Sequence, residues 1–338
     1  MLGALGTLAA TAVKVAIVFG LLLGMVAYLV WVERKVLGHI QIRRGPLHVG
    51  FHGLLQPIAD GVKLFLKEDV IPEGADRVLF SLAPAIMVAT ALSTFAVIPF
   101  GESVTVLGRT IHFHIADLNI GILYILAVSS LGVYGIILGG WASNNKFSLL
   151  GGLRSTAQMV SYELALGLAL VGPVMLAGTL RLRGIVEAQD GLWFVFLQPL
   201  GFLIYLVSAL AETNRIPFDL PEAESELVAG YHVEYSGMKF AFFFLAEYAS
   251  MITAAAIATT FFLGGYRGLP IPGLDSPWLG PVWFLAKVFV LLLVFIWIRG
   301  TLPRLRYDQL MRFGWKVLLP LAIVNIMLTG AVALWRQG

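Results

Sequence analysis

The sequence predicts an all-α polytopic membrane protein, with about eight transmembrane helices and an interfacial amphipathic helix in its first cytoplasmic loop. Of the 338 residues, 59% are hydrophobic and only 13% are charged, whereas a soluble domain carries about a quarter charged residues. Several apolar runs reach the roughly 20 residues that a helix needs to cross the hydrocarbon core. Helices are favoured because they satisfy their own backbone polar groups in lipid, and the alternating strands of a β-barrel are not seen.

Eight spans are expected from the apolar runs, over residues 10–32, 78–100, 118–140, 157–178, 192–211, 238–263, 281–299 and 316–335. The first run lacks the basic leader and the small-residue cleavage site of a signal peptide, so we expect a retained helix. No repeat or domain-sized linker divides the chain, which predicts a single membrane domain over residues 1–338. The pairs Gly20–Gly24 and Gly135–Gly139 have a spacing that allows two helices to approach closely.

The basic residues are distributed unevenly between the loops. Most lie in loops one, three, five and seven: Arg34, Lys35, Arg43, Arg44, Lys63, Lys67, Arg77, Lys146, Arg154, Arg215, Arg299, Arg304, Arg306, Arg312 and Lys316. The even-numbered loops and the C-terminal tail carry only Arg109, Arg181, Arg183, Arg267 and Arg336. Because cytoplasmic loops are enriched in Lys and Arg, the odd-numbered loops are expected in the cytoplasm and both termini on the outer side.

Loop one contains a segment, residues 51–67, with an apolar stripe at helical spacing. The stripe consists of Leu54, Ile58, Val62 and Phe65, opposite Gln56, Lys63 and Lys67. Such a helix is expected to lie in the plane of the membrane interface. The alternative is that the same stripe packs against the spans.

Two carboxylates lie inside predicted spans, Glu163 and Glu247. An ionisable residue in lipid is costly to bury and is therefore a candidate functional residue. The alternative role for each is a hydrogen-bonded carboxyl that holds helices together. Lys14 and Lys287 also fall within spans, but their long side chains are expected to extend toward the outer surface.

Loop five is acidic although it is expected on the cytoplasmic side. It carries Glu212, Asp219, Glu222, Glu224, Glu226 and Glu234 against a single basic residue, Arg215. A helix that starts at Pro221 would explain some of these carboxylates, because acidic groups are favourable at a helix N-terminus. Carboxylates crowded together titrate as a coupled set, and such a set can accept and pass protons.

The absence of some residues and motifs excludes several kinds of function. The chain has no cysteine, which excludes a cysteine-ligated iron–sulfur cluster and a thiol nucleophile within it. It has no phosphate-binding loop and no basic groove, so no nucleotide or nucleic-acid site is predicted, and no catalytic or metal-ligating residue is assigned.

The basic clusters around Arg34, Arg43 and Arg299 are either lipid-headgroup anchors or groups that guide a polar quinone headgroup inward.

The long stretch Ala211–Gly230, followed by Glu234–Gly237, resembles the signature loop of the H subunit of respiratory complex I. This family includes mitochondrial subunit 1, and complex I is the proton-pumping NADH:quinone oxidoreductase. Residues 31–35, 158–163 and 303–310 are similar to the same family. The resemblance extends from about residue 15 to residue 335.

The resemblance implies a protein of a bacterial inner membrane that encloses a quinone-access channel together with the hydrophilic B and D subunits. Its other expected neighbours are the A, J and K membrane subunits. It implies no redox centre in this chain: quinone is the substrate, and NADH, flavin and iron–sulfur clusters belong to partner subunits. The positions that match the quinone channel are Arg34, Arg43, Asp60, Phe244 and Arg299. Those that match an acidic path for proton coupling are Glu163, Glu212, Glu222, Glu224, Glu226, Glu234 and Glu247.

Four alternatives remain open from the sequence, one of them a purely structural anchor for peripheral subunits. The chain could be the related membrane component of an energy-converting hydrogenase or of a ferredoxin:quinone oxidoreductase. It could instead be a stand-alone proton-coupled transporter, although transporters usually contain an internal repeat with interrupted helices. The acidic loop and residues 303–310 fit complex I better than the hydrogenase, and no second copy of the loop-five pattern supports a transporter.

Overall fold

A computed structural model describes residues 2–106, 109–220, 224–268 and 276–337 of the chain. The helices are α1 (Leu2–Ile40), α2 (Gln56–Leu66), α3 (Arg77–Ser93), α4 (Gly121–Ala142), α5 (Lys146–Ala177), α6 (Leu182–Glu187), α7 (Phe194–Leu197), α8 (Pro199–Glu212), α9 (Glu224–Leu227), α10 (Gly237–Phe262), α11 (Gly280–Thr301), α12 (Tyr307–Phe313) and α13 (Leu319–Gln337). Two short strands, β1 (Val104–Val106) and β2 (Arg109–Ile111), form an antiparallel hairpin in the second loop, which the sequence did not predict.

The all-α polytopic membrane fold is confirmed. Within the described residues, seven helical segments are long and apolar enough to cross a membrane: Ala10–Ile40, Arg77–Ala96, Gly121–Ala142, Lys146–Ala177, Gly237–Phe262, Pro277–Thr301 and Tyr307–Trp335. The remaining predicted span, 192–211, is instead broken into α7 and the shorter apolar helix α8. The break lies at Gln198, whose φ of −132° and ψ of 51° are not helical, because Pro199 disfavours the helical conformation of the residue before it.

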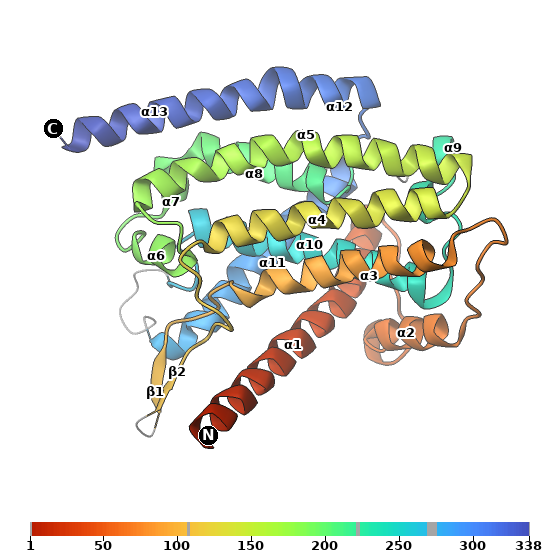
Figure 1. Ribbon diagram of the computed structural model, residues 1–338, viewed down its shortest axis with the longest axis horizontal. Coiled ribbons are helices and arrows are strands. Elements are labelled where there is room, and N and C mark those ends of the chain that lie inside the picture. The colour runs from red at the N-terminus through yellow and green to blue at the C-terminus, as the bar shows by residue number, and fades with distance from the viewer. Residues whose placement is uncertain (1, 107–108, 221–223, 269–275, 338) are drawn as a thin grey trace.

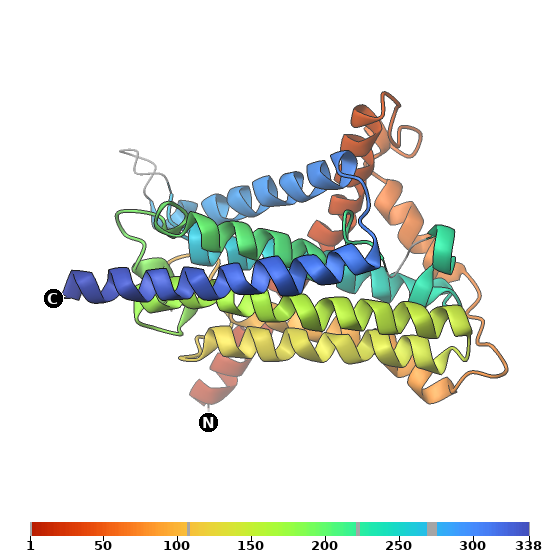
Figure 2. The same ribbon diagram turned by 90° about the horizontal axis from the view of Figure 1, so that it is seen from above.

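The spanning helices form a bundle in which α1 crosses the others obliquely (Figures 1 and 2). The elements α2, α9 and α12, which belong to odd-numbered loops, lie at one end of the bundle. The β1–β2 hairpin, α6 and the C-terminus lie at the other end. Odd-numbered loops thus lie at one end of the bundle, and even-numbered loops and the C-terminus lie at the other. This arrangement agrees with an even number of membrane crossings. Which end faces the cytoplasm stays a prediction.

The predicted loop-one helix exists as α2, which packs against α1 and α10. Its apolar stripe faces away from these helices: Ile58 is 57% exposed, Val62 54% and Phe65 75%. The alternative that the stripe packs against the spans is therefore wrong for this chain. Its position at a membrane interface stays a prediction.

The two glycine pairs differ in how closely other helices approach them. A Cβ added to Gly135 on α4 would lie 2.5 Å from Cγ of Met87 and 2.9 Å from the backbone oxygen of Ala83, both on α3. A Cβ at Gly20 or Gly24 would meet none of the described residues within 4 Å. Close helix packing is thus confirmed at Gly135, and no described helix of this chain packs at the α1 pair.

Helix α13 is held to the break between α7 and α8 by buried polar side chains. The amide nitrogen of Gln198 donates to Oγ1 of Thr329 at 2.6 Å, and its amide oxygen accepts from Nδ2 of Asn325 at 2.9 Å. All three side chains are buried. Hydrogen bonds between membrane helices of this kind stabilise their association.

Lys287 on α11 reaches the even-numbered loop that follows α10, at the end of the bundle predicted to be outer, and is part-buried there. Its ammonium group donates to the backbone oxygens of Leu263, Gly265 and Arg267, at 2.6, 3.0 and 2.5 Å. It also lies 4.3 Å from the ring centre of Trp193. The lysine therefore satisfies carbonyl groups at and beyond the C-terminal end of α10, where helices leave such groups unpaired.

Candidate functional site

A buried cluster of charged side chains joins α1, α10, α11 and loop five. Its centre is Glu33 on α1, which is only 4% exposed. One carboxylate oxygen of Glu33 accepts a hydrogen bond from the hydroxyl of Tyr248 at 2.6 Å. The other forms ion pairs with Arg215, at 3.3 Å, and with Arg299. A carboxylate buried this deeply requires such partners, because removing a charge from water costs several kcal/mol.

Arg215 connects Glu33 to a second carboxylate. Its Nε lies 2.6 Å from an oxygen of Glu247 on α10. Its guanidinium group lies over the ring of Tyr248, 4.3 Å from the ring centre, a distance at which cation–π attraction is significant. We call Glu33, Arg215, Glu247, Tyr248 and Arg299 the arginine–carboxylate network.

Loop five is held beside this network by contacts to neighbouring elements. Asp219 pairs with Arg304, which follows α11, at 3.1 Å. The buried amide nitrogen of Gln158 on α5 donates to the backbone oxygens of Ala211 and Phe218, at 2.8 and 2.7 Å. The first part of loop five is therefore packed inside the protein, where Asp219 is 7% exposed.

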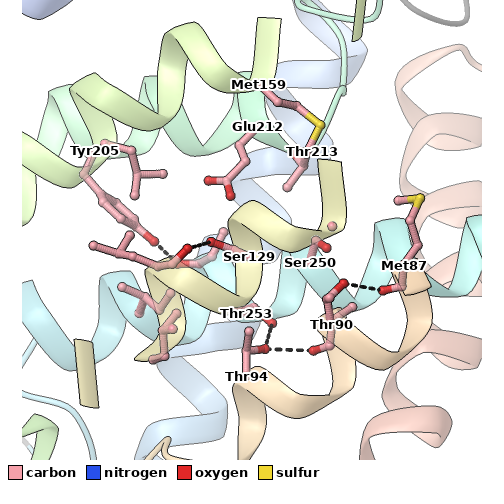
Figure 3. Close-up of a pocket in the computed structure, with 17 residues that line it drawn as sticks. Met87, Thr90, Thr94, Ser129, Met159, Tyr205, Glu212, Thr213, Ser250 and Thr253 are labelled. Atoms are coloured by element: carbon pink, nitrogen blue, oxygen red, sulfur yellow. Dashed lines mark hydrogen bonds between the residues drawn. The ribbon is translucent and has the colours of Figure 1, made fainter. Parts of the chain in front are cut away.

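Two further carboxylates of the predicted acidic path, which we call the Glu163–Glu212 pair, belong to the neighbouring helices α5 and α8. Glu163 on α5 accepts a hydrogen bond from the hydroxyl of Ser130 on α4. Glu212 lies at the end of α8. Figure 3 shows the Glu212 carboxylate pointing into a small cavity between the helices.

The rest of the predicted acidic path lies in other surroundings. Glu226 pairs with Arg154 at 2.7 Å and is exposed, and Glu234 accepts from Nδ2 of Asn145 at 2.6 Å. Glu222 lies outside the described residues, and Glu224 begins α9. The structure thus divides the predicted acidic residues between the arginine–carboxylate network, the Glu163–Glu212 pair and individual contacts of loop five.

The predicted quinone-channel residues are also divided between different places. Arg34 pairs with Asp60 at 2.9 Å at the odd-loop end of the bundle, where half of the arginine side chain is exposed. Arg43 donates to the side chain of Gln41 at 2.7 Å and lines an open basic hollow together with Arg34. Phe244 on α10 is half-buried, and Arg299 belongs to the arginine–carboxylate network.

Phe244 packs near a buried histidine of loop five, His232. The two ring centres are 5.8 Å apart, and the rings of Tyr231 and Phe240 also lie against the imidazole. His232 is 6% exposed, and its Nδ1 has no hydrogen-bond partner among the described residues. Burial disfavours the charged imidazolium and lowers the pKa of His232 to about 4.

Three residues that complete the network were given no role from the sequence: Glu33, Arg215 and Tyr248. Arg215 had a recognisable signal, because it is the single basic residue among the carboxylates of loop five. Glu33 has no such signal, because it stands directly before the basic residues Arg34 and Lys35 at the end of the first span. Its burial follows from the buried face of α1, which continues from Leu22, Val26 and Leu29.

Comparison with known proteins identifies the family. The family model described as NADH dehydrogenase matches residues 13–330. The chain belongs to the NADH dehydrogenase family. It is 57% identical over 324 residues, 96% of each chain, to a curated protein of Geobacter metallireducens that is named as an H subunit of NADH-quinone oxidoreductase. It is 58% identical over 322 residues, 95% of each chain, to a protein of Syntrophobacter fumaroxidans with the same subunit name.

These matches confirm the predicted resemblance to the H subunit of complex I, since they cover nearly the whole chain. A curated protein of Geobacter sulfurreducens, 57% identical over 322 residues, is also named as an H subunit of NADH-quinone oxidoreductase. Together with the apolar helices, family membership identifies the chain as a multi-pass membrane protein.

Proposed function

We propose that this protein is the H subunit of a proton-translocating NADH:quinone oxidoreductase, and that it couples quinone reduction to proton movement. In this role it borders the quinone-access channel and carries the carboxylates through which the reaction is linked to translocation. The proposal is supported by the names of these three relatives, each of them a component of NADH-quinone oxidoreductase. These names favour this function over an energy-converting hydrogenase or a stand-alone transporter.

The observation that carries the coupling proposal is a continuous series of ion pairs that links Arg299 to Glu247 through Glu33 and Arg215. Arg299, a proposed channel residue, pairs with Glu33. Glu33 pairs with Arg215, and Arg215 pairs with Glu247, a proposed coupling residue, at 2.6 Å. When the charge of either carboxylate changes, an arginine that lies between them pairs more strongly with the more negative one. The effect is large because charges interact strongly in a poorly solvated interior.

The mechanism follows from this arrangement. Reduction of a quinone in the channel takes up protons and changes the charge beside Arg299 and Glu33. Arg215 then interacts more strongly with one carboxylate and less strongly with the other. A carboxylate that loses its cationic partner binds a proton more readily, since burial disfavours its charged form. Glu247 would take up or release a proton in this way, and Glu212 and Glu163 would continue the path.

The expected partners are the other subunits of the complex. Two kinds of surface suit such neighbours: the exposed stripe of α2, and the basic hollow lined by Arg34, Arg43 and Arg44 at the odd-loop end. The proposal places the hydrophilic B and D subunits at this end, on the cytoplasmic side of a bacterial inner membrane. The A, J and K membrane subunits would lie alongside the spanning helices. NADH, flavin and iron–sulfur clusters would belong to partner subunits, with quinone as the shared substrate.

Replacing Glu247 with glutamine tests the coupling role. Glutamine keeps the size and can accept a hydrogen bond, but it cannot carry a proton. In membranes that contain the assembled complex, we expect Glu247→Gln to lower NADH-driven proton translocation by roughly a hundredfold, the scale of losing a positioned proton-transfer group. Glu187→Gln is the matched control, because Glu187 is exposed, pairs with Arg183 and is not among the proposed coupling residues.

Two results would argue against the proposal. Wild-type proton translocation in both Glu247→Gln and Glu212→Gln would remove the coupling role of the carboxylates. Photolabelling with a quinone analogue tests the channel separately: label on peptides that contain Arg34, Arg43 or Phe244 is expected, and its absence from this chain would remove the channel assignment.

A further inference from the structure

The cavity beside Glu212 has a lining that the proposed acidic path does not explain. Its volume is about 60 Å³, and α3, α4, α5, α8 and α10 contribute side chains to its wall (Figure 3). The wall contains many hydroxyl groups, from Thr90, Thr94, Ser129, Tyr205, Thr213, Ser250 and Thr253. A polar cavity of this size has room for a few water molecules, whereas cavities lined only by apolar groups stay dry.

The wall of the cavity mixes polar and apolar side chains. Because α8 runs toward the odd-loop end and α10 runs away from it (Figure 1), Glu212 and Thr213 mark the odd-loop end of the cavity. Tyr205 comes earlier on α8 and lies farther from that end (Figure 3). The cavity therefore has a carboxylate at one end, and hydroxyl groups as well as apolar side chains line the rest of its wall.

Several hydroxyl groups of the wall already donate their single proton to backbone oxygens. Thr90 donates to Ile86 and Met87, both at 3.0 Å, and Ser129 donates to Leu126 at 3.0 Å. A hydroxyl has one donor and two acceptor lone pairs. These groups consequently offer acceptors to the cavity, and acceptors favour an occupant that donates hydrogen bonds, such as water that carries an extra proton.

Thr94 and Thr253 form a pair that can change its donor direction. Their hydroxyl oxygens are 3.2 Å apart. Each hydroxyl is also within hydrogen-bond distance of its own helix, Thr94 at 2.8 Å from the oxygen of Ala91 and Thr253 at 3.0 Å from that of Ala249. One of the two hydroxyls can therefore rotate so that it donates to the other threonine instead of to its own helix. The lone pairs that the two hydroxyls offer to the cavity then point in different directions. Such a pair adapts to the arrival or departure of a proton nearby.

We propose that the cavity is a hydrated site that holds a proton transferred from Glu212. The proton passes from the carboxyl of Glu212 to the water in the cavity, where Thr90, Ser129 and the Thr94–Thr253 pair accept its hydrogen bonds. The proton returns to Glu212 when the charge of the network changes. The inference rests on the proposed function, since it requires Glu212 to belong to the acidic path.

The test is made in the assembled complex with Thr94→Val/Thr253→Val, a change that keeps side-chain shape and removes both hydroxyls. Thr259→Val is the matched control, because Thr259 is also buried on α10 and donates to Ala255 at 2.9 Å but does not line the cavity. We expect the double variant to lower proton translocation about tenfold, the effect of losing one hydrogen bond to the moving proton. Redox-induced infrared difference spectra should also lose the broad, deuterium-sensitive band of protonated water.

Further variants keep the test decisive if the double variant does not assemble. Ser129→Ala changes the wall from a different helix, α4, and should weaken the same infrared band. The proposal is overturned if Thr94→Val/Thr253→Val or Ser129→Ala behaves like Thr259→Val while Glu212→Gln impairs translocation, and the acidic path then stands without the cavity. Wild-type translocation in Glu212→Gln would instead remove Glu212 from the path, and the inference with it.

Discussion

The hydroxyl of Tyr248 on α10 donates a hydrogen bond of 2.6 Å to Glu33 on α1, 215 positions earlier in the chain. The same tyrosine ring lies under the guanidinium of Arg215. One side chain thus positions both the carboxylate and the arginine of the network. This arrangement holds the first and the tenth helix together through polar contacts in a region where lipid offers none.

Glu33 is expected to matter more for stability than Glu247, because it pairs with two arginines and Glu247 pairs with one. Glu33→Gln keeps a hydrogen-bond acceptor for the hydroxyl of Tyr248, but it removes the negative charge that pairs with Arg215 and Arg299. Breaking a buried pair in this way costs about 3–5 kcal/mol. We expect a lower inactivation temperature and less assembled complex, measured by activity after heating and by native gel electrophoresis. Glu33→Gln should lose more stability than Glu247→Gln, and Glu68→Gln, which changes an exposed carboxylate of loop one, serves as the control. Equal stability of Glu33→Gln and Glu247→Gln would contradict the prediction.

Gly135→Ala is expected to separate α3 from α4. Its new methyl group would lie 2.5 Å from Cγ of Met87 and 2.9 Å from a backbone oxygen, which cannot move without shifting the helix. Overpacking of this kind costs about 1–3 kcal/mol. Gly20→Ala is the matched control, because no described residue of this chain lies within 4 Å of the added atom. Measurement of heat inactivation should show a loss for Gly135→Ala only; a neutral Gly135→Ala would mean that the helices adjust without cost.

Gln198 and Asn325 are expected to act as one unit in holding α13. Gln198→Leu removes the acceptor of the buried Asn325 amide, at a cost of about 1–3 kcal/mol, while Thr329 keeps its hydrogen bond to the backbone oxygen of Asn325. Asn325→Leu should cost a similar amount, and the double variant less than the sum of the two. A double-mutant cycle on the heat stability of the complex measures this coupling. Additive effects would show that the 2.9 Å contact does not contribute to stability.

His232 predicts a pH dependence for loop five. Burial lowers its pKa to about 4 from 6.5, so the unfolded loop binds a proton more readily than the folded one. Stability is therefore complete above the unfolded pKa and decreases as the pH falls from about 6.5 to about 4, by about 3 kcal/mol in total. Hydrogen exchange of amides near His232, corrected for the intrinsic effect of pH, should show loss of protection over this range.

His232→Phe should remove this pH dependence, because phenylalanine suits the aromatic surroundings of Tyr231, Phe240 and Phe244 and does not titrate. His48→Phe changes an exposed histidine and should leave the dependence unchanged. The same loss of protection in His232→Phe would assign the effect to another group.

The spans could be predicted well because a membrane imposes a length and a composition on each crossing helix. The exception, 192–211, shows a limit of hydropathy. An average over a window does not register a local break, although Pro199 is a visible signal for one. The loop-one helix was predicted from its periodicity, but only the structure shows that its apolar stripe faces away from α1 and α10.

The candidate site was predicted in part. Carboxylates such as Glu163 and Glu247 were identified because charge is rare in lipid-embedded segments, and Glu212 because loop five is unusually acidic. Their division into the arginine–carboxylate network and the Glu163–Glu212 pair could not be predicted, since it depends on helices far apart in the sequence. The hydroxyl-lined cavity was missed because serine and threonine are common in membrane helices and show no pattern until the helices are assembled.

Composition, charge distribution and the loop-five motif were sufficient to determine the class of protein, the approximate spans and the family. Tertiary structure decided which side chains meet, and Glu33 illustrates the physical reason. Helix α1 is apolar on all sides, so its sequence does not indicate which face turns inward. The fold places Leu22, Val26, Leu29 and Glu33 on the buried side. A charge at the end of a span therefore becomes the centre of a buried network only once α10 and α11 pack against that face.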